Sequence, residues 1–362
     1  MKNTFGQSVT LTLFGESHGA QIGGVIDGLA PGIRVDEEFI RHQLSLRRPR
    51  GRISTPRVEA DEFSIVSGVF EGRTTGTPIC ILIPNTNTRS TDYERGLPRP
   101  GHADYTAEMK YHGFQDYRGG GHFSGRVTAA LVAAGAIAIS ALMQNGILIG
   151  THISRLATVR DRGFEDLESD LERLGDLEFP VFDPAIAQRM KDCIEAAAAE
   201  GDSVGGILET AVIGLPAGVG EPWFDTVEGV LSHALFSIPA VKGVEFGDGF
   251  ALADMRGSTA NDGLRFSGER VVTTTNHNGG INGGITNGMP VIFRCAVKPT
   301  PSIFHQQESV DLAKRQNALL TLEGRHDPAI IHRARVVVDS VTALVLCDLL
   351  AQRYGTDFVD ID

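Results

Sequence analysis

The chain has 362 residues and a net charge of −12, with 41% hydrophobic and 22% charged residues, an ordinary composition for a folded protein with a large core. The acidic balance argues against nucleic acid as the main partner. No stretch reaches the roughly 18 consecutive apolar residues that a membrane span needs, and the amino terminus turns polar too early for a signal peptide. We therefore expect a cytoplasmic protein.

Residue patterns predict strands and helices that alternate along a single domain, residues 1–362. The expected strands are 9–14, 22–29, 63–70, 79–83, 147–153, 241–246 and 291–297. The expected helices are 36–46, 103–111, 185–200 and 226–236, and two long apolar ones at 127–144 and 329–353. Residues 161–183 are charged and irregular, and we expect them to form a peripheral insertion.

Two short stretches resemble each other. Residues 204–219 (VGGILETAVIGLPAGV) repeat features of residues 22–33 (IGGVIDGLAPGI): a Gly-Gly pair, an acid, Gly-Leu, and then a proline and a glycine. The second copy is four residues longer. This similarity suggests an internal duplication in which the two long apolar helices are counterparts.

The four cysteines, Cys80, Cys193, Cys295 and Cys347, lie far apart and lack the spacing of a metal site. We expect them to be reduced core residues in a reducing compartment. No metal-binding site is predicted.

The most unusual segment is residues 99–126, RPGHADYTAEMKYHGFQDYRGGGHFSGR. It holds three histidines and three consecutive glycines, and it leads into the apolar helix at 127–144. Glycines allow positive φ and close approach of the backbone, and Ser124 is a candidate N-cap. A glycine-rich loop before a core helix is the simpler interpretation, but it leaves the imidazole and guanidinium groups unexplained.

Arginine is concentrated between Arg41 and Arg57, where six arginines occur without any acid. Over the whole chain 27 of the 33 basic residues are arginine, the cation suited to bidentate binding of phosphate and carboxylate. The patch predicts a small ligand with several negative charges. A solvated basic surface is the alternative.

Three further places are candidate sites. His18 follows a predicted strand and lies between glycines, where we expect it to be exposed. Residues 276–288 hold five glycines and four asparagines, a loop that could wrap a ligand. Asp327 follows Arg325 and His326 just before the last helix, where it is either a site residue or an N-cap.

Common signatures are missing. There is no Gly-x-Gly-x-x-Gly, no lysine after a glycine and no His-Glu-x-x-His, which argues against a dehydrogenase, a kinase and a zinc hydrolase. The histidines, arginines and Asp327 together indicate acid–base chemistry on a phosphorylated or carboxylated small molecule.

Several motifs, in order, carry a resemblance to the chorismate synthase family from Phe5 to the last helix. They are GESHG at 15–19 with Asp27-Gly28, RPGHADY at 99–105, YRGGG at 117–121 with Ser124-Gly-Arg126, VKGVE at 241–245 with Gly247-Asp-Gly249, Asn287-Gly288, Lys298-Pro-Thr300 and RHDP at 325–328. The resemblance implies an α+β fold, a sandwich of long helices between antiparallel sheets, assembled as a homotetramer.

It also implies the reaction. The family eliminates phosphate in a 1,4 sense from 5-enolpyruvylshikimate 3-phosphate to give chorismate, the last step of the shikimate pathway towards aromatic amino acids. It requires reduced FMN without net redox change, and NADPH is associated with the family. Because no spare domain for flavin reduction is evident in the sequence, we expect a separate flavin reductase.

Site residues follow by motif. His18 would protonate the leaving phosphate, His102 would serve the flavin, and Asp327 would act with flavin N5 to remove the substrate proton. The implied substrate-binding residues are Ser17, Arg47, Arg48, Arg52, Arg99, Ser124, Arg126 and Arg325. The implied FMN-binding residues are His122, Phe123, Ser124, Ala240, Gly283, Lys298, Thr300, Ser302 and Arg325.

Three positions depart from the family pattern. His122 stands where many members have Arg, Pro239 where many have Asn, and Asp339 where many have Glu. The first two would change flavin contacts, and the third would change packing or a polar network. The alternative functions are a flavin-dependent oxidoreductase and a non-catalytic flavin- or phosphate-binding protein.

Overall fold

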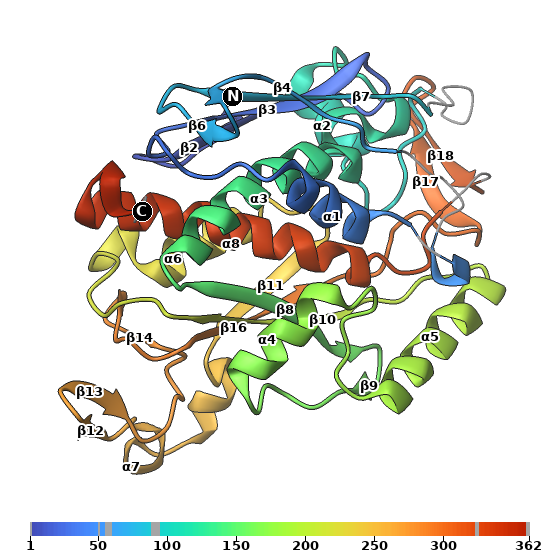
Figure 1. Ribbon diagram of the computed structural model, residues 1–362. Coiled ribbons are helices and arrows are strands. Elements are labelled where there is room, and N and C mark those ends of the chain that lie inside the picture. The colour runs from blue at the N-terminus through green and yellow to red at the C-terminus, as the bar shows by residue number, and fades with distance from the viewer. Residues whose placement is uncertain (1, 50, 55–59, 88–94, 323–325, 360–362) are drawn as a thin grey trace.

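Two long helices form the centre of the molecule (Figure 1). The computed structural model describes residues 2–49, 51–54, 60–87, 95–322 and 326–359. Helices α3 (Thr128–Gln144) and α8 (Ile331–Tyr354) are buried over most of their length, which confirms both predicted apolar helices. The stretch Gly125–Gln144 is the one helical segment among the described residues that is apolar and long enough to cross a membrane, but 78% of it is buried inside the protein. It is a core helix.

Helices α3 and α8 approach closely where a glycine faces a serine. A Cβ atom built on Gly135 would lie 2.2 Å from the Cβ of Ser340, far inside van der Waals contact. Ser340 is itself fully buried and donates its hydroxyl to the carbonyl of Val336. Glycine at 135 is therefore required by this helix crossing.

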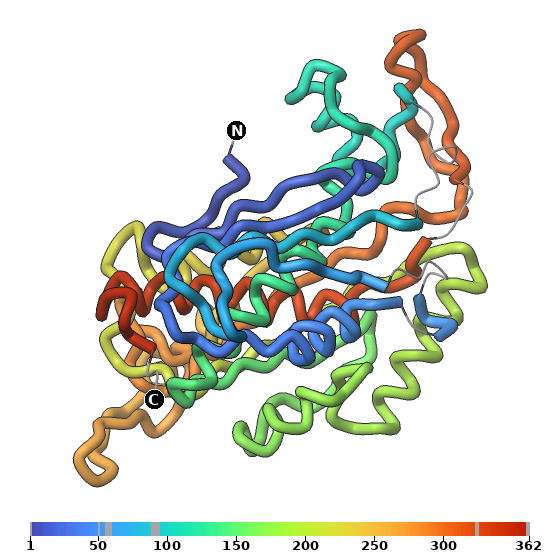
Figure 2. The backbone as a smooth tube through the Cα atoms, turned by 45° about the horizontal axis from the view of Figure 1, so that its top comes forward, coloured from blue at the N-terminus to red at the C-terminus, as the bar shows by residue number. Residues whose placement is uncertain are grey.

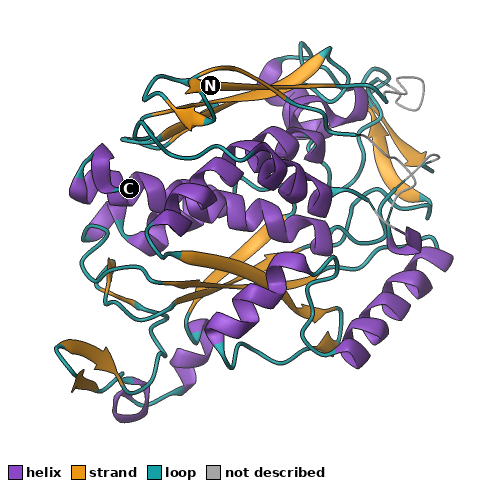
Figure 3. Cartoon of the chain, in the orientation of Figure 1, coloured by secondary structure: helices purple, strands orange, loops and turns teal. Residues whose placement is uncertain are grey.

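Two five-stranded antiparallel sheets cover the helix layer on opposite sides (Figure 3). The first sheet has the order β1 (Thr4–Phe5), β2 (Thr10–Gly15), β3 (Gln21–Asp27), β7 (Ile79–Pro84) and β4 (Ser64–Ser67). The second has the order β11 (Val241–Phe246), β16 (Val291–Val297), β10 (Gly206–Ile213), β8 (Leu148–Leu156) and β9 (Val159–Arg160). The predicted α+β sandwich of long helices between antiparallel sheets is confirmed.

Shorter elements complete the chain. The remaining helices are α1 (Glu37–Arg47), α2 (Asp104–Tyr111), α4 (Leu167–Asp176), α5 (Pro184–Ala199), α6 (Val227–Leu235) and α7 (Gly257–Ala260). The short hairpins pair β5 (Val69–Phe70) with β6 (Arg73–Thr74), β12 (Leu264–Ser267) with β13 (Arg270–Thr273), β14 (Ile281–Asn282) with β15 (Ile285–Thr286), and β17 (Gln307–Asp311) with β18 (Gln316–Leu320). Hairpin β12–β13 projects from the body of the molecule (Figure 2).

Two expectations need correction. The strand predicted at 63–70 is broken at Gly68, whose φ of +81° turns the chain out of the first sheet between β4 and β5. Residues 161–183 are not irregular, because they contain α4. Leu171 and Leu174 of α4 lie in a buried apolar cluster with Phe182, and this cluster includes a residue of β10, Ala211.

The suggested internal duplication is supported by matching hydrogen bonds. In the first copy, the hydroxyl of Thr74 donates to the carbonyl of Ala30 at 2.6 Å and accepts from the N–H of Ile33 at 3.0 Å. In the second copy, the hydroxyl of Thr286 donates to the carbonyl of Pro216 at 2.6 Å and accepts from the N–H of Val219 at 2.9 Å. In addition, β3 and β10 each occupy the centre of a five-stranded sheet.

Candidate active site

The three consecutive glycines form a turn against two histidine rings. Gly119, Gly120 and Gly121 have φ values of +59°, +80° and +53°, in the region that favours glycine. A Cβ on Gly119 would lie 2.6 Å from the ring of His18, and a Cβ on Gly120 would lie 3.0 Å from Cε1 of His102. The glycines therefore bring both imidazoles, 84 residues apart in sequence (102 − 18), against one turn.

His102 is held by its own turn. Its Nδ1 lies 2.7 Å from Asp104 Oδ1, and Arg99 binds the same carboxylate through Nε at 2.7 Å and Nη2 at 2.8 Å. Burial alone would raise the pKa of Asp104, but the hydrogen bonds from Arg99 and His102 hold the pKa well below its usual range. Asp104 is thus a carboxylate at any working pH. It was not among the residues singled out from the sequence.

The backbone on the other side of the glycine turn is fixed by the end of β2. The N–H of Ser17 donates to the carbonyl of Gly121 at 3.0 Å, and the Nδ1 of His122 lies 2.8 Å from the carbonyl of Gly15. The hydroxyl of Ser17 is fully buried and has no hydrogen-bond partner among the residues that the structure describes. A buried orphan hydroxyl of this kind is a candidate ligand contact.

Two of the predicted arginines share a buried carboxylate. Arg47 ends α1 and donates to Thr128 Oγ1 at 2.8 Å, and Arg126 donates to Asn85 Oδ1 at 2.9 Å. Both guanidinium groups contact Asp61, whose side chain is 2% exposed and whose φ is +52°. The sequence analysis did not identify Asp61, because its partners lie 14 and 65 residues away in sequence (61 − 47 and 126 − 61).

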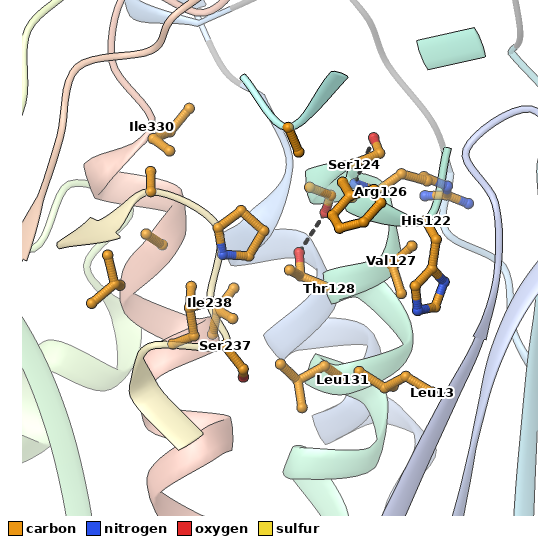
Figure 4. A pocket seen from close by; sticks show the side chains of 18 of the residues that line it. Leu13, His122, Ser124, Arg126, Val127, Thr128, Leu131, Ser237, Ile238 and Ile330 are labelled. Carbon is orange, nitrogen blue, oxygen red and sulfur yellow. Dashed lines mark hydrogen bonds between the residues drawn. The ribbon is translucent and has the colours of Figure 1, made fainter. Parts of the chain in front are cut away.

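A pocket of about 980 Å³ lies where the glycine turn, the segment after α6, the segment after β16 and the start of α8 meet (Figure 4). Apolar side chains, among them Leu131, Ile238 and Ile330, form part of its wall. The predicted site residues that line it are Arg47, Arg99, His102, His122, Phe123, Ser124, Arg126, Ala240, Lys298, Thr300, Ser302 and Asp327.

Other predicted site residues lie outside the pocket lining. His18 and Ser17 lie behind Gly119, which does line the pocket. Arg48 donates to the carbonyl of Ala60, and Arg52 is exposed on the turn Gly51–Ile53. Gly283 is exposed in the turn between β14 and β15, and Arg325 falls outside the described residues. Their roles stay predictions.

Asp327 does not cap the last helix. The N-cap position of α8 is Ile330, which offers no side-chain cap, and Asp327 instead binds Nη1 of Arg333 at 2.7 Å. Arg333 also donates Nε to the carbonyl of Arg47 at 2.8 Å. Arg333, which the sequence analysis missed, therefore ties the carboxylate of Asp327 to the end of α1. The spacing of residues in the sequence gave no indication that Asp327 and Arg333 would form an ion pair.

The structure shows the contacts around Pro239 and Asp339, two of the positions that depart from the family pattern. Pro239 precedes Ala240, a non-glycine residue with a φ of +75°, whose carbonyl accepts the N–H of Lys298 at 2.9 Å. Such backbone conformations cluster at ligand sites. Asp339 is buried on α8 and accepts the hydroxyl of Thr151 at 2.6 Å, so of the two expected effects, on packing or on a polar network, this contact belongs to the second. Burial raises the pKa of Asp339 to about 6.

The arrangement places several imidazoles, the carboxylates of Asp61 and Asp327 and several guanidinium groups around one pocket, with His18 directly behind its wall. Imidazoles and carboxylates exchange protons near neutral pH, and guanidinium groups bind phosphate and carboxylate. Among the described residues no group of three or more His, Cys, Asp or Glu is placed to hold a metal ion. The geometry suits proton transfer on an anionic small molecule.

Comparison with known proteins gives a consistent result. The family model described as chorismate synthase matches residues 9–351. The chorismate synthase of Aeropyrum pernix is 47% identical over 358 residues, covering 97% of this chain and 93% of the relative. That of Thermococcus kodakarensis is 45% identical over 351 residues, covering 96% and 97%. A solved chorismate synthase structure superposes with a TM-score of 0.77 at 29% identity, covering 97% of this chain and 94% of the other.

Proposed function

This chain belongs to the chorismate synthase family and is an enzyme, and we propose that it converts 5-enolpyruvylshikimate 3-phosphate to chorismate by 1,4-elimination of phosphate. The proposal makes it a carbon–oxygen lyase of aromatic amino-acid biosynthesis. The observation that carries it is the glycine turn, which holds His18 and His102 against one loop beside a pocket lined by Arg47, Arg126 and Asp327.

The reaction is demanding for acid–base groups alone. The C–H bond that breaks is allylic and weakly acidic, and the phosphate does not leave from the neighbouring carbon. Reduced FMN, when bound, would lend electron density to the substrate ring and take it back, without net oxidation. The side chains of the chain then have three tasks: binding the anionic groups, protonating the leaving phosphate, and accepting the proton that the substrate loses.

We assign these tasks from the family resemblance, residue by residue. Arg47 and Arg126 bind the negative groups of the substrate, because charge-assisted and bidentate hydrogen bonds favour phosphate and carboxylate. His18 donates a proton to the departing phosphate, which turns a poor leaving group into a better one. Asp327 accepts the substrate proton, and His102 supplies a proton beside the flavin. The position of Arg47, Arg126, His102 and Asp327 in the pocket lining, with His18 behind Gly119, supports this assignment.

The pocket has the features that FMN requires. Its wall is partly apolar, which suits an aromatic ring system, and Lys298 and Ser302 supply polar groups for a phosphate. Thr300 lines the pocket, and its buried hydroxyl has no hydrogen-bond partner within the described part of the chain. The Nζ of Lys298 donates to the carbonyl of Gly101 at 2.5 Å, next to His102. We propose that these residues, with Ala240 and Phe123, hold FMN.

We also propose a cytoplasmic homotetramer that receives reduced FMN from a separate flavin reductase. Several large apolar side chains between residues 223 and 266 are exposed, and such exposure is typical of subunit interfaces. They are Trp223, Phe224, Phe250, Leu264 and Phe266, exposed by 75% or more. Sedimentation at several concentrations would test the tetramer, and an assay with NADPH and FMN but no reductase would test the need for a second protein.

One assay tests the main proposal. The purified protein is mixed anaerobically with chemically reduced FMN and 5-enolpyruvylshikimate 3-phosphate, and chorismate is followed directly. We expect turnover with reduced FMN, none with oxidised FMN, and no stoichiometric loss of reductant. Consumption of one reductant per product would instead indicate a flavin-dependent oxidoreductase, and flavin binding without turnover would indicate a binding protein.

A further inference from the structure

We propose that Asp104 is a positioning residue that keeps the proton of neutral His102 on Nδ1, so that Nε2 is the nitrogen that exchanges protons at the site. The inference rests on the proposed function, in which His102 acts as a proton donor. It adds a residue and a tautomer that the assigned roles do not contain. In this proposal Arg99 holds the carboxylate of Asp104.

The hydrogen-bond distances fix the tautomer. Nδ1 of His102 has two neighbours: Asp104 Oδ1 at 2.7 Å and Arg99 Nη2 at 3.0 Å. If Nδ1 carried no proton, its lone pair would face an ionised carboxylate oxygen at 2.7 Å, which is strongly unfavourable. If Nδ1 carries the proton, it donates to Asp104, and Arg99 Nη2 still has Asp104 Oδ1 at 2.8 Å as its acceptor. The second arrangement satisfies every group.

The carboxylate of Asp104 is held in a fixed position, and it therefore determines which nitrogen of His102 carries the proton. Arg99 grips it with two side-chain hydrogen bonds and a third from its backbone N–H at 3.0 Å to Oδ2. The three residues lie within one turn, closed by the His102 N–H to the Arg99 carbonyl at 3.2 Å, and Lys298 binds the carbonyl of Gly101 in that turn. Asp104 also begins α2, where a negative charge is favoured by the helix dipole.

The opposite edge of the imidazole lies against the glycine turn. A Cβ on Gly120 would lie 3.0 Å from Cε1 and 3.3 Å from Nε2 of His102, so the bare backbone leaves room at that edge. Charged and titratable groups near this place include Lys298, His18 across the glycine turn, and the Asp116–Arg118 ion pair in the segment that leads into that turn. With Nδ1 occupied by Asp104, any proton that His102 gives or takes there must pass through Nε2.

The test reads the tautomer directly. Protein with ¹⁵N-labelled histidine is examined by NMR without FMN, and the His102 signals are identified by their loss in His102→Gln. We expect neutral His102 in the wild type to carry its proton on Nδ1. In Asp104→Asn the amide oxygen still accepts from Arg99, but the amide NH₂ then faces Nδ1, so the ratio of the tautomers should change about tenfold or more towards Nε2–H.

A matched variant and a rate complete the experiment. Glu108→Gln removes a carboxylate one turn along α2 that binds Gln115 and not His102, and it should leave the tautomer unchanged. Asp104→Asn should also slow single turnover with reduced FMN by about a hundredfold or more, with substrate affinity changed less than the rate. If Asp104→Asn does not fold, the tautomer of His102 in the wild type becomes the decisive measurement, and Asp104→Glu replaces Asp104→Asn as the variant.

The outcomes separate this inference from the proposed function. A wild-type His102 with its proton on Nε2, or a tautomer ratio that does not respond to Asp104→Asn, would overturn the inference. A tautomer that switches while turnover stays normal would support the positioning by Asp104 but remove His102 from the catalytic roles. Failure of every variant and of the wild type to form chorismate would refute the proposed function and leave the tautomer result intact.

Discussion

Gly119→Ala should impair the site without unfolding the protein. The new Cβ would lie 2.6 Å from Cδ2 and Nε2 of His18 and 3.0 Å from the hydroxyl of Ser17, where normal contacts are about 3.5 Å or more. The ring of His18 is a side-chain terminus and can move, so it should shift by about 1 Å. A displacement of about 1 Å in a catalytic group can cost on the order of a hundredfold in rate.

The stability cost should be smaller and has a matched control. Gly119 has a φ of +59°, and placing alanine in that region costs about 1–2 kcal/mol. Gly72 has a φ of +73°, and a Cβ there would meet nothing within 4 Å, so Gly72→Ala carries the same backbone cost without the contact. Denaturant unfolding and single-turnover assays on both variants separate the two effects. Near-normal turnover by folded Gly119→Ala would refute the assigned contact between the glycine turn and a catalytic His18.

Three further predictions concern binding, packing and pH. Arg52→Ala should weaken substrate binding about tenfold or more in titrations without loss of stability, because Arg52 is exposed. Arg47→Ala should lower both the substrate affinity and the free energy of unfolding, because Arg47 is buried. Equal stability of the two variants would contradict this. Gly135→Ala should lower the free energy of unfolding by about 2 kcal/mol through overpacking, and unchanged denaturant unfolding would refute the close helix contact. Because burial raises the pKa of Asp339 to about 6, the contribution of Asp339 to stability falls as pH rises from 4 to 7, so Asp339→Asn should gain up to about 3 kcal/mol relative to the wild type over that range. A difference that does not change with pH would show that Asp339 is not protonated in the folded state.

Local and periodic features were predictable from the sequence. The helix predicted from residue 36 is α1, which Asp36 caps by accepting the N–H groups of Glu38 and Phe39, and the apolar composition of α3 and α8 identified the core. The missed helix α4 also had a signal, since Asp166 is its N-cap and Leu167, Leu171 and Leu174 lie at helical spacing. Its high charge concealed that pattern.

Pairings between distant side chains were not predictable. Asp61 meets Arg126 across 65 positions (126 − 61), and only the folded chain brings the end of α1, the segment before β4 and the segment after the glycine turn together. Asp104 lies two residues from His102, yet no spacing rule distinguishes a carboxylate that binds a histidine from one that begins a helix. Motifs therefore predicted the candidate reactive groups, whereas the groups that would orient them required the structure.

Replacing Asp327 distinguishes a structural role of its carboxylate from a chemical one. Since it does not cap α8, its structural role is the ion pair with Arg333, which in turn binds the carbonyl of Arg47. Asp327→Asn keeps an oxygen acceptor for Arg333, so the free energy of unfolding should fall by only about 1 kcal/mol. A group that accepts a proton in the reaction cannot be replaced by an amide, and its loss should slow single turnover by about 10²–10⁴.

The matched control is Asp170→Asn. Asp170 forms a comparable pair with Arg162, at 2.5 Å, in the outer helix α4, away from the pocket. Both variants should lose some stability, because each weakens an ion pair, but only Asp327→Asn should lose turnover while FMN and substrate still bind. If Asp327→Asn turns over as fast as Asp170→Asn, its carboxylate acts only through Arg333, and the proton must be accepted elsewhere, with the neighbouring His326, which also lines the pocket, as the first group to test.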